Sequence, residues 1–141
     1  RQQGGPAPLF GRREERERAL LLLYEAEQRD LDAAGILADQ AIAPEPYVVE
    51  IVTGVHEHLA DIDAVLSRLS TGWPLDRMPA IDRAVLRLGA YELGHRPEVP
   101  TAVVLNEAVE LANSYSTDDS GRFVNGVLAA VAREARPDDA A

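Results

Sequence analysis

The chain of 141 residues is 46% apolar, which is enough for one compact domain or for two small subdomains with a shared core. Its formal net charge of −10 argues, taken alone, against binding to nucleic acid and to anionic membrane surfaces. The lack of cysteine excludes disulfides and thiolate chemistry and is compatible with the cytoplasm, the compartment that we expect. All 14 basic residues are arginine, which suits bidentate phosphate contacts, although a genome rich in G and C would produce the same bias.

Apolar periodicity predicts an all-α fold, a compact bundle of about six to seven helices in two subdomains. No run of strand length alternates cleanly between apolar and polar residues. The longest apolar run, at 19–24, is too short to cross a bilayer, so no membrane association is expected.

The N-terminal part of the chain predicts three helices. Residues 1–10 are rich in Gly, Pro and Gln and are predicted to form a disordered tail. A helix is predicted over 11–29, a short one over 30–40, and, after a loop with proline, a long one over 47–69. The first subdomain is therefore expected to cover 11–70.

Turn-forming residues at 70–79 separate this subdomain from a second one at 71–136, which is followed by a loose tail at 137–141. The next helix is predicted to start near Pro79, a favoured residue for a first helical turn, and to end at a cap formed by Gly94.

Residues 99–131 predict two helices joined by the polar turn S-T-D-D-S, with the second helix beginning at Phe123. Asn125 and Gly126 are unfavourable inside a helix, where glycine costs about 1 kcal/mol relative to alanine. In the long predicted helix before 70, Gly54 is expected to loosen the structure.

Arginines crowd the start of the first predicted helix. Arg12 and Arg16 lie four residues apart and Arg13 and Arg16 three apart, spacings at which like charges repel each other on a helix. One interpretation is a surface on which these arginines form salt bridges with the glutamates between them. The alternative is an edge that contacts phosphates.

Two aromatic residues, Tyr115 and Phe123, flank the polar turn, with Asp119 one helical turn before Phe123 and Arg122 next to it. Helical spacing places Phe123 at the edge of the apolar stripe. Its ring therefore either seals the helix pair or stacks on an unpaired base, and the residues alone favour the seal.

Other clusters predict no chemistry. His56 and His58 diverge by about 200° on a helix and cannot share a tetrahedral metal. Asp118 and Asp119 are explained by helix capping rather than as a catalytic pair. Since no nucleophile elbow or phosphate-binding glycine loop is present, the sequence predicts neither an enzyme nor a cofactor or metal site.

Four motifs follow one another in the C-terminal half of the sequence. They are D-R-A-V-L-R-L-G-A-Y-E-L at 82–93, V-P at 99–100, N-E-A-V-E-L-A at 106–112 and F-V-N-G-V-L at 123–128. In this order they resemble the NusB family of bacterial transcription antitermination factors, whose arginine-rich first helix resembles residues 12–24. Within the last motif, close backbone packing is the reason that we infer for Gly126.

The resemblance implies binding of boxA, a single-stranded element of ribosomal-operon RNA, together with NusE, a small-subunit ribosomal protein, in an RNA polymerase antitermination complex. It also implies RNA contacts from the arginine-rich helix and from the F-V-N-G region, and a NusE face on the second subdomain with Asp82 as the candidate contact. Some family members form homodimers, so a second copy of the chain is a further candidate partner. The RNA candidates are Arg12, Arg13, Arg16, Tyr115, Asp119, Arg122 and Phe123.

Two alternatives stay open. The acidic balance and the glutamates of the arginine helix are compatible with a helical protein-interaction module that does not bind RNA. A NusB-like RNA-binding domain of a larger ribosomal RNA methyltransferase is the other, although no cofactor-binding α/β domain follows within the 141 residues. For the leading interpretation, the same acidity predicts weak boxA binding by the chain alone, with NusE supplying the missing affinity.

Overall fold

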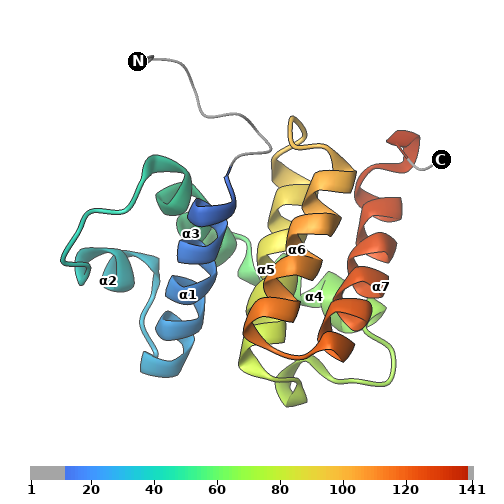
Figure 1. The fold of residues 1–141 in the computed structure, drawn as a ribbon, viewed down its shortest axis with the longest axis horizontal. Helices are drawn as coiled ribbons and strands as arrows, with labels where there is room; N and C mark the ends of the chain where they lie inside the picture. Colours follow the sequence, from blue (N-terminus) through green and yellow to red (C-terminus); the bar gives the residue numbers. More distant parts are fainter. Residues whose placement is uncertain (1–11, 140–141) are drawn as a thin grey trace.

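The computed structural model describes residues 12–139 (Figure 1) and confirms the predicted all-α class for this part of the chain, in which no strand occurs. The helices are α1 (Arg13–Arg29), α2 (Ala33–Ala38), α3 (Pro46–Glu57), α4 (Leu59–Leu69), α5 (Ala80–His95), α6 (Thr101–Tyr115) and α7 (Asp118–Ala135), with short 3-10 turns η2 (Leu75–Arg77) and η3 (Pro137–Asp139). None of the described helices is both long and apolar enough to cross a membrane. The tail predicted for 1–10 lies outside the described residues.

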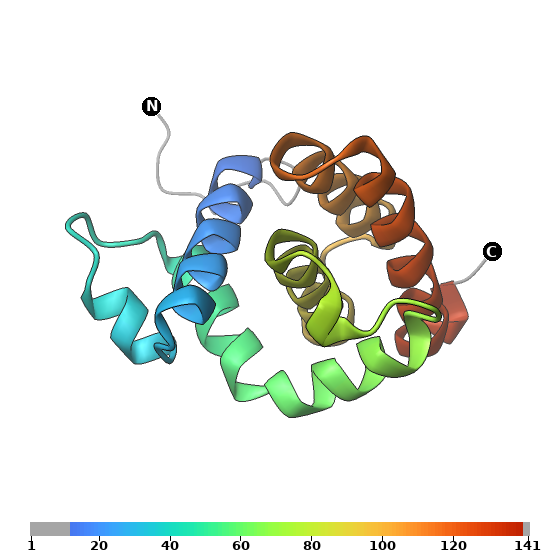
Figure 2. The same cartoon turned by 90° about the horizontal axis from the view of Figure 1, so that it is seen from below.

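Helix α5 is the central element of the fold. Helices α1, α3, α4, α6 and α7 all pack against it, and Figure 2 shows them as a ring around it. The sequence of α5 explains this position, because nearly every residue from Ala84 to Leu93 is apolar or small and buried. A helix that is apolar all round is stable only where other elements cover every side.

The single long helix predicted over 47–69 is wrong. The chain forms two helices, α3 and α4, which meet at His58. The bend lets α3 pack against α1 while α4 continues around α5 towards α7 (Figure 2). Apolar periodicity did not reveal the bend, because both helices turn their apolar side to the same central helix.

The predicted ends of the later helices also change. Gly94 does not cap α5, which continues to His95, and α7 begins at Asp118 rather than at Phe123. The end of α5 and its connection to α6 are instead held from a distance, because all five N–H groups of the Arg136 guanidinium donate hydrogen bonds to this segment. Their acceptors are the carbonyl oxygens of Glu92, Leu93, Arg96 and Val99 and the hydroxyl of Thr101.

Beyond α7, part of the predicted loose tail has structure. Residues Pro137–Asp139 form η3, and the Asp139 carboxylate accepts a hydrogen bond from the Thr101 hydroxyl. The division into subdomains at 70–79 stays a prediction, since α5 contacts helices from both sides of that boundary.

Glycines permit the closest helix contacts, although not at the predicted position. A Cβ atom added to Gly54 would lie 2.3 Å from Cε1 of the buried Tyr91 ring, so this glycine tightens the α3–α5 contact rather than loosening α3. A Cβ added to Gly126 would meet nothing within 4 Å, so the close packing inferred for that residue is wrong.

We expect opposite effects from alanine at these two glycines. Gly54→Ala should destabilise the fold by about 1–3 kcal/mol, because the new methyl group overlaps a buried ring. Gly126→Ala, in open space within α7, should stabilise it by up to about 1 kcal/mol through helix propensity. Urea unfolding measures the free energy of unfolding of both variants. Equal changes in this free energy would contradict the packing described for α3 and α5.

Candidate nucleic-acid interface

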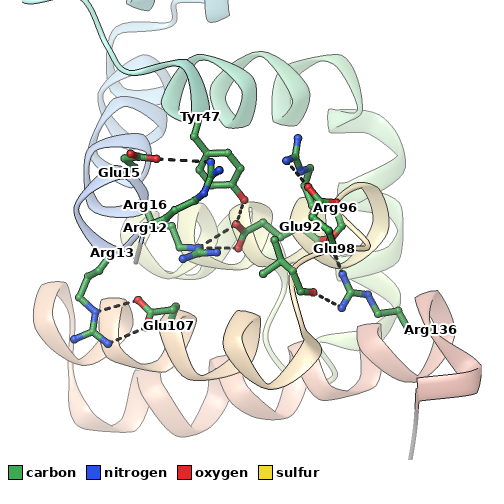
Figure 3. Close-up of polar contacts among 11 residues, drawn as sticks. Arg12, Arg13, Glu15, Arg16, Tyr47, Glu92, Arg96, Glu98, Glu107 and Arg136 are labelled. Atoms are coloured by element: carbon green, nitrogen blue, oxygen red, sulfur yellow. Dashed lines mark hydrogen bonds and ion pairs between the residues drawn. The ribbon is translucent and has the colours of Figure 1, made fainter. Parts of the chain in front are cut away.

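The third candidate arginine, Arg16, lies inside the protein at the contact between α1 and α5 (Figure 3). Its Nε donates to both carboxylate oxygens of Glu92, at 3.1 and 3.0 Å, and each of the two side chains is 1% exposed. The hydroxyl of Tyr47, from α3, donates to the same carboxylate. Burial and the negative charge of Glu92 raise the pKa of Tyr47, so this phenol stays a hydrogen-bond donor. A surface contact with phosphate is therefore not available to Arg16 in this structure.

The other two candidate arginines on this helix are also held by tertiary contacts. Arg12 is 14% exposed, and its guanidinium carbon lies 4.0 Å from the centre of the Tyr47 ring, within cation–π range. Arg13 is half-exposed and reaches α6, where Nε and Nη2 donate to the two oxygens of Glu107 at 3.0 and 2.8 Å. The hydrogen bond from Arg13 holds the pKa of Glu107 below its ordinary value.

Salt bridges with neighbouring glutamates account for little of this arrangement. Arg12 does lie 3.8 Å from Glu15, as the helical spacing predicts. Arg18 donates instead to the Ile42 carbonyl at 2.6 Å and lies 3.5 Å from Glu45, both in the loop before α3. The arginines at the start of α1 are thus held mainly by contacts with other helices and loops. Of the three candidates, only Arg13 keeps a large exposed surface.

The turn between α6 and α7 presents the remaining candidates. Tyr115, the last residue of α6, is 38% exposed, while Asp119 and Arg122 form an ion pair that is almost fully open to solvent. The Phe123 ring is half-buried and meets the Trp73 ring edge-on, with 4.8 Å between the ring centres. Phe123 therefore packs against the core while part of its surface stays open, so both interpretations of this ring keep a physical basis.

Helix α7 begins with a hydroxyl cap rather than the predicted aspartate cap. The Thr117 side chain accepts a hydrogen bond from the Ser120 N–H at 3.2 Å, whereas Asp118 and Asp119 lie in the first turn. Acidic residues in a first turn are favoured by the helix dipole. Below this turn, Asp82 has no exposed surface, so the residue predicted to contact NusE lies inside the protein.

A cleft of about 890 Å³ lies beside Trp73 and is bordered by Arg83 and Arg87. Arg83 donates to both oxygens of Glu27 at 2.5 and 2.9 Å, and Arg87 donates to both oxygens of Asp63 at 2.9 and 2.8 Å. The hydrogen bond from Arg83 lowers the pKa of Glu27. These guanidinium groups are already paired with carboxylates. They therefore have little capacity left to bind a phosphate group in the cleft.

Sequence reasoning missed four residues that organise the candidate interface: Tyr47, Trp73, Glu92 and Glu107. Glu92 left a detectable signal, since it is the one charged residue in the stretch 88–93, a pattern that indicates a buried ion pair. Glu107 and Tyr47 left none, because their partners are distant in the sequence.

Comparisons with known proteins agree with this architecture. A sequence model of the NusB family matches residues 13–133. The chain is also 50% identical over 128 residues to the transcription antitermination protein NusB of Kineococcus radiotolerans, an alignment that covers 88% of this chain and 94% of that protein. The chain belongs to the NusB family.

Solved NusB structures share the fold. NusB of T. maritima is 34% identical with a TM-score of 0.81, and the match covers 96% of this chain and 98% of the other. A crystal structure of antitermination factors NusB and NusE in complex with dsRNA contains a chain that is 26% identical with a TM-score of 0.76. That match covers 87% of this chain and 96% of the other. The assignment of individual RNA- and partner-contacting residues stays a prediction.

We expect the loss of one partner of the buried Arg16–Glu92 pair to destabilise the fold strongly. Glu92→Ala should lower the free energy of unfolding by about 3–5 kcal/mol, because it leaves the Arg16 guanidinium buried without its carboxylate. Glu107→Ala should have a much smaller effect, because its partner Arg13 is half-exposed to solvent. Urea unfolding compares the two variants, and the double variant Arg16→Met/Glu92→Leu should recover most of the lost stability. Equal losses for Glu92→Ala and Glu107→Ala would contradict the difference in burial.

Proposed function

We propose that this chain is a transcription antitermination factor that binds boxA RNA jointly with NusE and joins an RNA polymerase antitermination complex in the cytoplasm. It acts by binding, not as an enzyme. The observation that carries the proposal is the 50% identity, over nearly the full length of both chains, to a transcription antitermination protein NusB. The match to a chain from a complex of NusB, NusE and dsRNA supports RNA and NusE as the partners.

The RNA surface that we propose on this chain runs beside α6. It consists of exposed residues that lie next to this helix at two levels along its axis. Arg13 lies at the level of Glu107 on α6, and the aromatic turn starts at Tyr115, about 12 Å further along the helix axis. A single-stranded RNA is able to follow this path. Arg13, Tyr115, Arg122 and Phe123 present accessible groups to it, whereas Arg12 and Arg16 support the surface from within.

The net charge of the chain and the pairing of its arginines support RNA binding jointly with NusE. The net charge is −10, and the arginines of α1 are already engaged by carboxylates, a carbonyl or an aromatic ring. Few of these arginines remain available to contact phosphates, and such contacts are what release counterions from RNA. The chain alone therefore has little electrostatic affinity for RNA. In the proposed complex, NusE supplies the missing contacts.

The test is a salt titration of boxA RNA and of a scrambled RNA, each with and without NusE. The expected result is strong, salt-sensitive preference for boxA with NusE present, and weak binding by the chain alone. Absence of a sequence-dependent signal under both conditions would favour a protein-interaction module without RNA binding.

For the aromatic edge, Phe123→Ala should weaken boxA binding by the complex by about tenfold, since loss of one stacked base is worth roughly 1–3 kcal/mol. Val131→Ala is the matched control, because Val131 is 4% exposed on the same helix, about 12 Å from Phe123. Thermal unfolding and RNA affinity are measured for both variants. A lower melting temperature with unchanged RNA affinity in Phe123→Ala would show that the ring is only part of the core.

A homodimer is a second proposal, carried by one apolar patch. Leu21 and Tyr24 on α1 are 41% and 37% exposed, and two further apolar residues are exposed, Ile42 in the loop before α3 and Val49 on α3, the helix that packs against α1. Arg18 joins the two halves of the patch, since it lies one turn before Leu21 and donates to the Ile42 carbonyl. The other leucines of the apolar run at 19–24, at positions 20, 22 and 23, are buried in the core.

Leu21→Glu should shift a dimer to monomer without a loss of thermal stability, because Leu21 is already 41% exposed. Gln28→Glu adds the same charge at an exposed position of the same helix and should leave the oligomeric state unchanged. Light scattering across a concentration series measures the mass, and a native chain that is monomeric throughout would refute this second proposal.

A further inference from the structure

Asp82 is a buried carboxylate in the first turn of the central helix α5. It is 0% exposed, and its Oδ2 accepts a hydrogen bond of 2.8 Å from the Ser120 hydroxyl on α7. Within residues 12–139, the second oxygen, Oδ1, has no hydrogen-bond partner. Its position in the first turn of α5 is one where the helix dipole favours an acidic side chain.

Ser120 connects Asp82 to the turn between α6 and α7. Its hydroxyl lies 3.0 Å from the Ser116 hydroxyl and 3.1 Å from the Thr117 hydroxyl. A serine hydroxyl has one proton and two acceptor positions, and an ionised carboxylate only accepts. Because Ser120 donates its proton to Asp82, it accepts from Ser116 and Thr117, and Asp82 thereby sets the direction of all three hydrogen bonds.

The same turn is fixed on a second side by close helix packing. A Cβ atom at Gly121 would lie 2.2 Å from Oδ1 of Asn113, so α7 begins directly against α6. Thr117 also caps α7 by accepting from the Ser120 N–H. The backbone from Tyr115 to Phe123 is thus held from beneath by hydroxyl groups whose orientation depends on one buried carboxylate.

We propose that Asp82 is a positioning residue for RNA recognition: through Ser120, it holds the α6–α7 turn in the conformation that presents Tyr115, Arg122 and Phe123. The proposal rests on the RNA binding proposed above. It also changes the role predicted for Asp82, since a side chain without exposed surface cannot contact NusE docked on this structure. Its effect on RNA is indirect.

The experiment measures boxA and scrambled RNA binding by the chain with NusE, NusE binding itself, and thermal stability for Asp82→Ala, Ser120→Ala and the double variant. Each single variant should weaken boxA binding by about tenfold and reduce the preference over scrambled RNA. The double variant should be no weaker than the singles, because both act through one contact. Asp82→Asn, which keeps an acceptor for Ser120, should retain most of the affinity, and NusE binding should stay unchanged in every variant.

Val55→Ala is the matched control, since Val55 is 1% exposed on α3 and its loss should lower stability without affecting boxA binding. Amide hydrogen exchange at 115–123 should become faster in Asp82→Ala and not in Val55→Ala. Unchanged boxA affinity in Asp82→Ala, or loss of NusE binding with intact RNA binding, would overturn the positioning role. If the native complex does not prefer boxA, the proposed function fails instead, and the exchange data alone then report whether Asp82 holds the turn.

Discussion

The packing around α5 is constrained by the ion pair between Arg16 and Glu92, which is almost completely removed from solvent. A buried carboxylate without partners is strongly unfavourable, so Glu92 restricts what packs around it. Its carboxylate binds Arg16 of α1 and Tyr47 of α3, and its backbone carbonyl accepts from Arg136 after α7. One residue of the central helix thereby fixes the positions of three other elements.

Helix α5 carries buried carboxylates near both of its ends, about 15 Å apart along its axis. Glu92 holds α1 and α3, while Asp82 holds the α6–α7 turn through Ser120. Both parts of the proposed RNA surface are therefore attached to the same rigid helix. This arrangement places Arg13 and the aromatic turn in a defined relation, although they come from opposite ends of the sequence.

The arginines at the start of α1 show how tertiary contacts engage charged groups that the sequence presents as available for binding. On an isolated helix they would form a basic stripe, yet Arg16 is buried with Glu92, Arg12 stacks on Tyr47, and Arg13 binds Glu107. Guanidinium groups held in this way have little freedom to contact phosphates. These contacts and the net charge of −10 support the joint mechanism that we propose, in which NusE supplies part of the affinity for RNA.

The sequence alone determined the all-α class, the approximate extent of α1, α5 and α6, and membership of the NusB family through its ordered motifs. Apolar periodicity and short motifs are local signals, and they are sufficient for these conclusions. The bend at His58, the burial of Arg16 and Asp82, and the cap supplied by Arg136 were decided only by the tertiary structure. Each depends on a partner far away in the chain, and a charged side chain looks the same in sequence whether it faces water or a buried counter-charge.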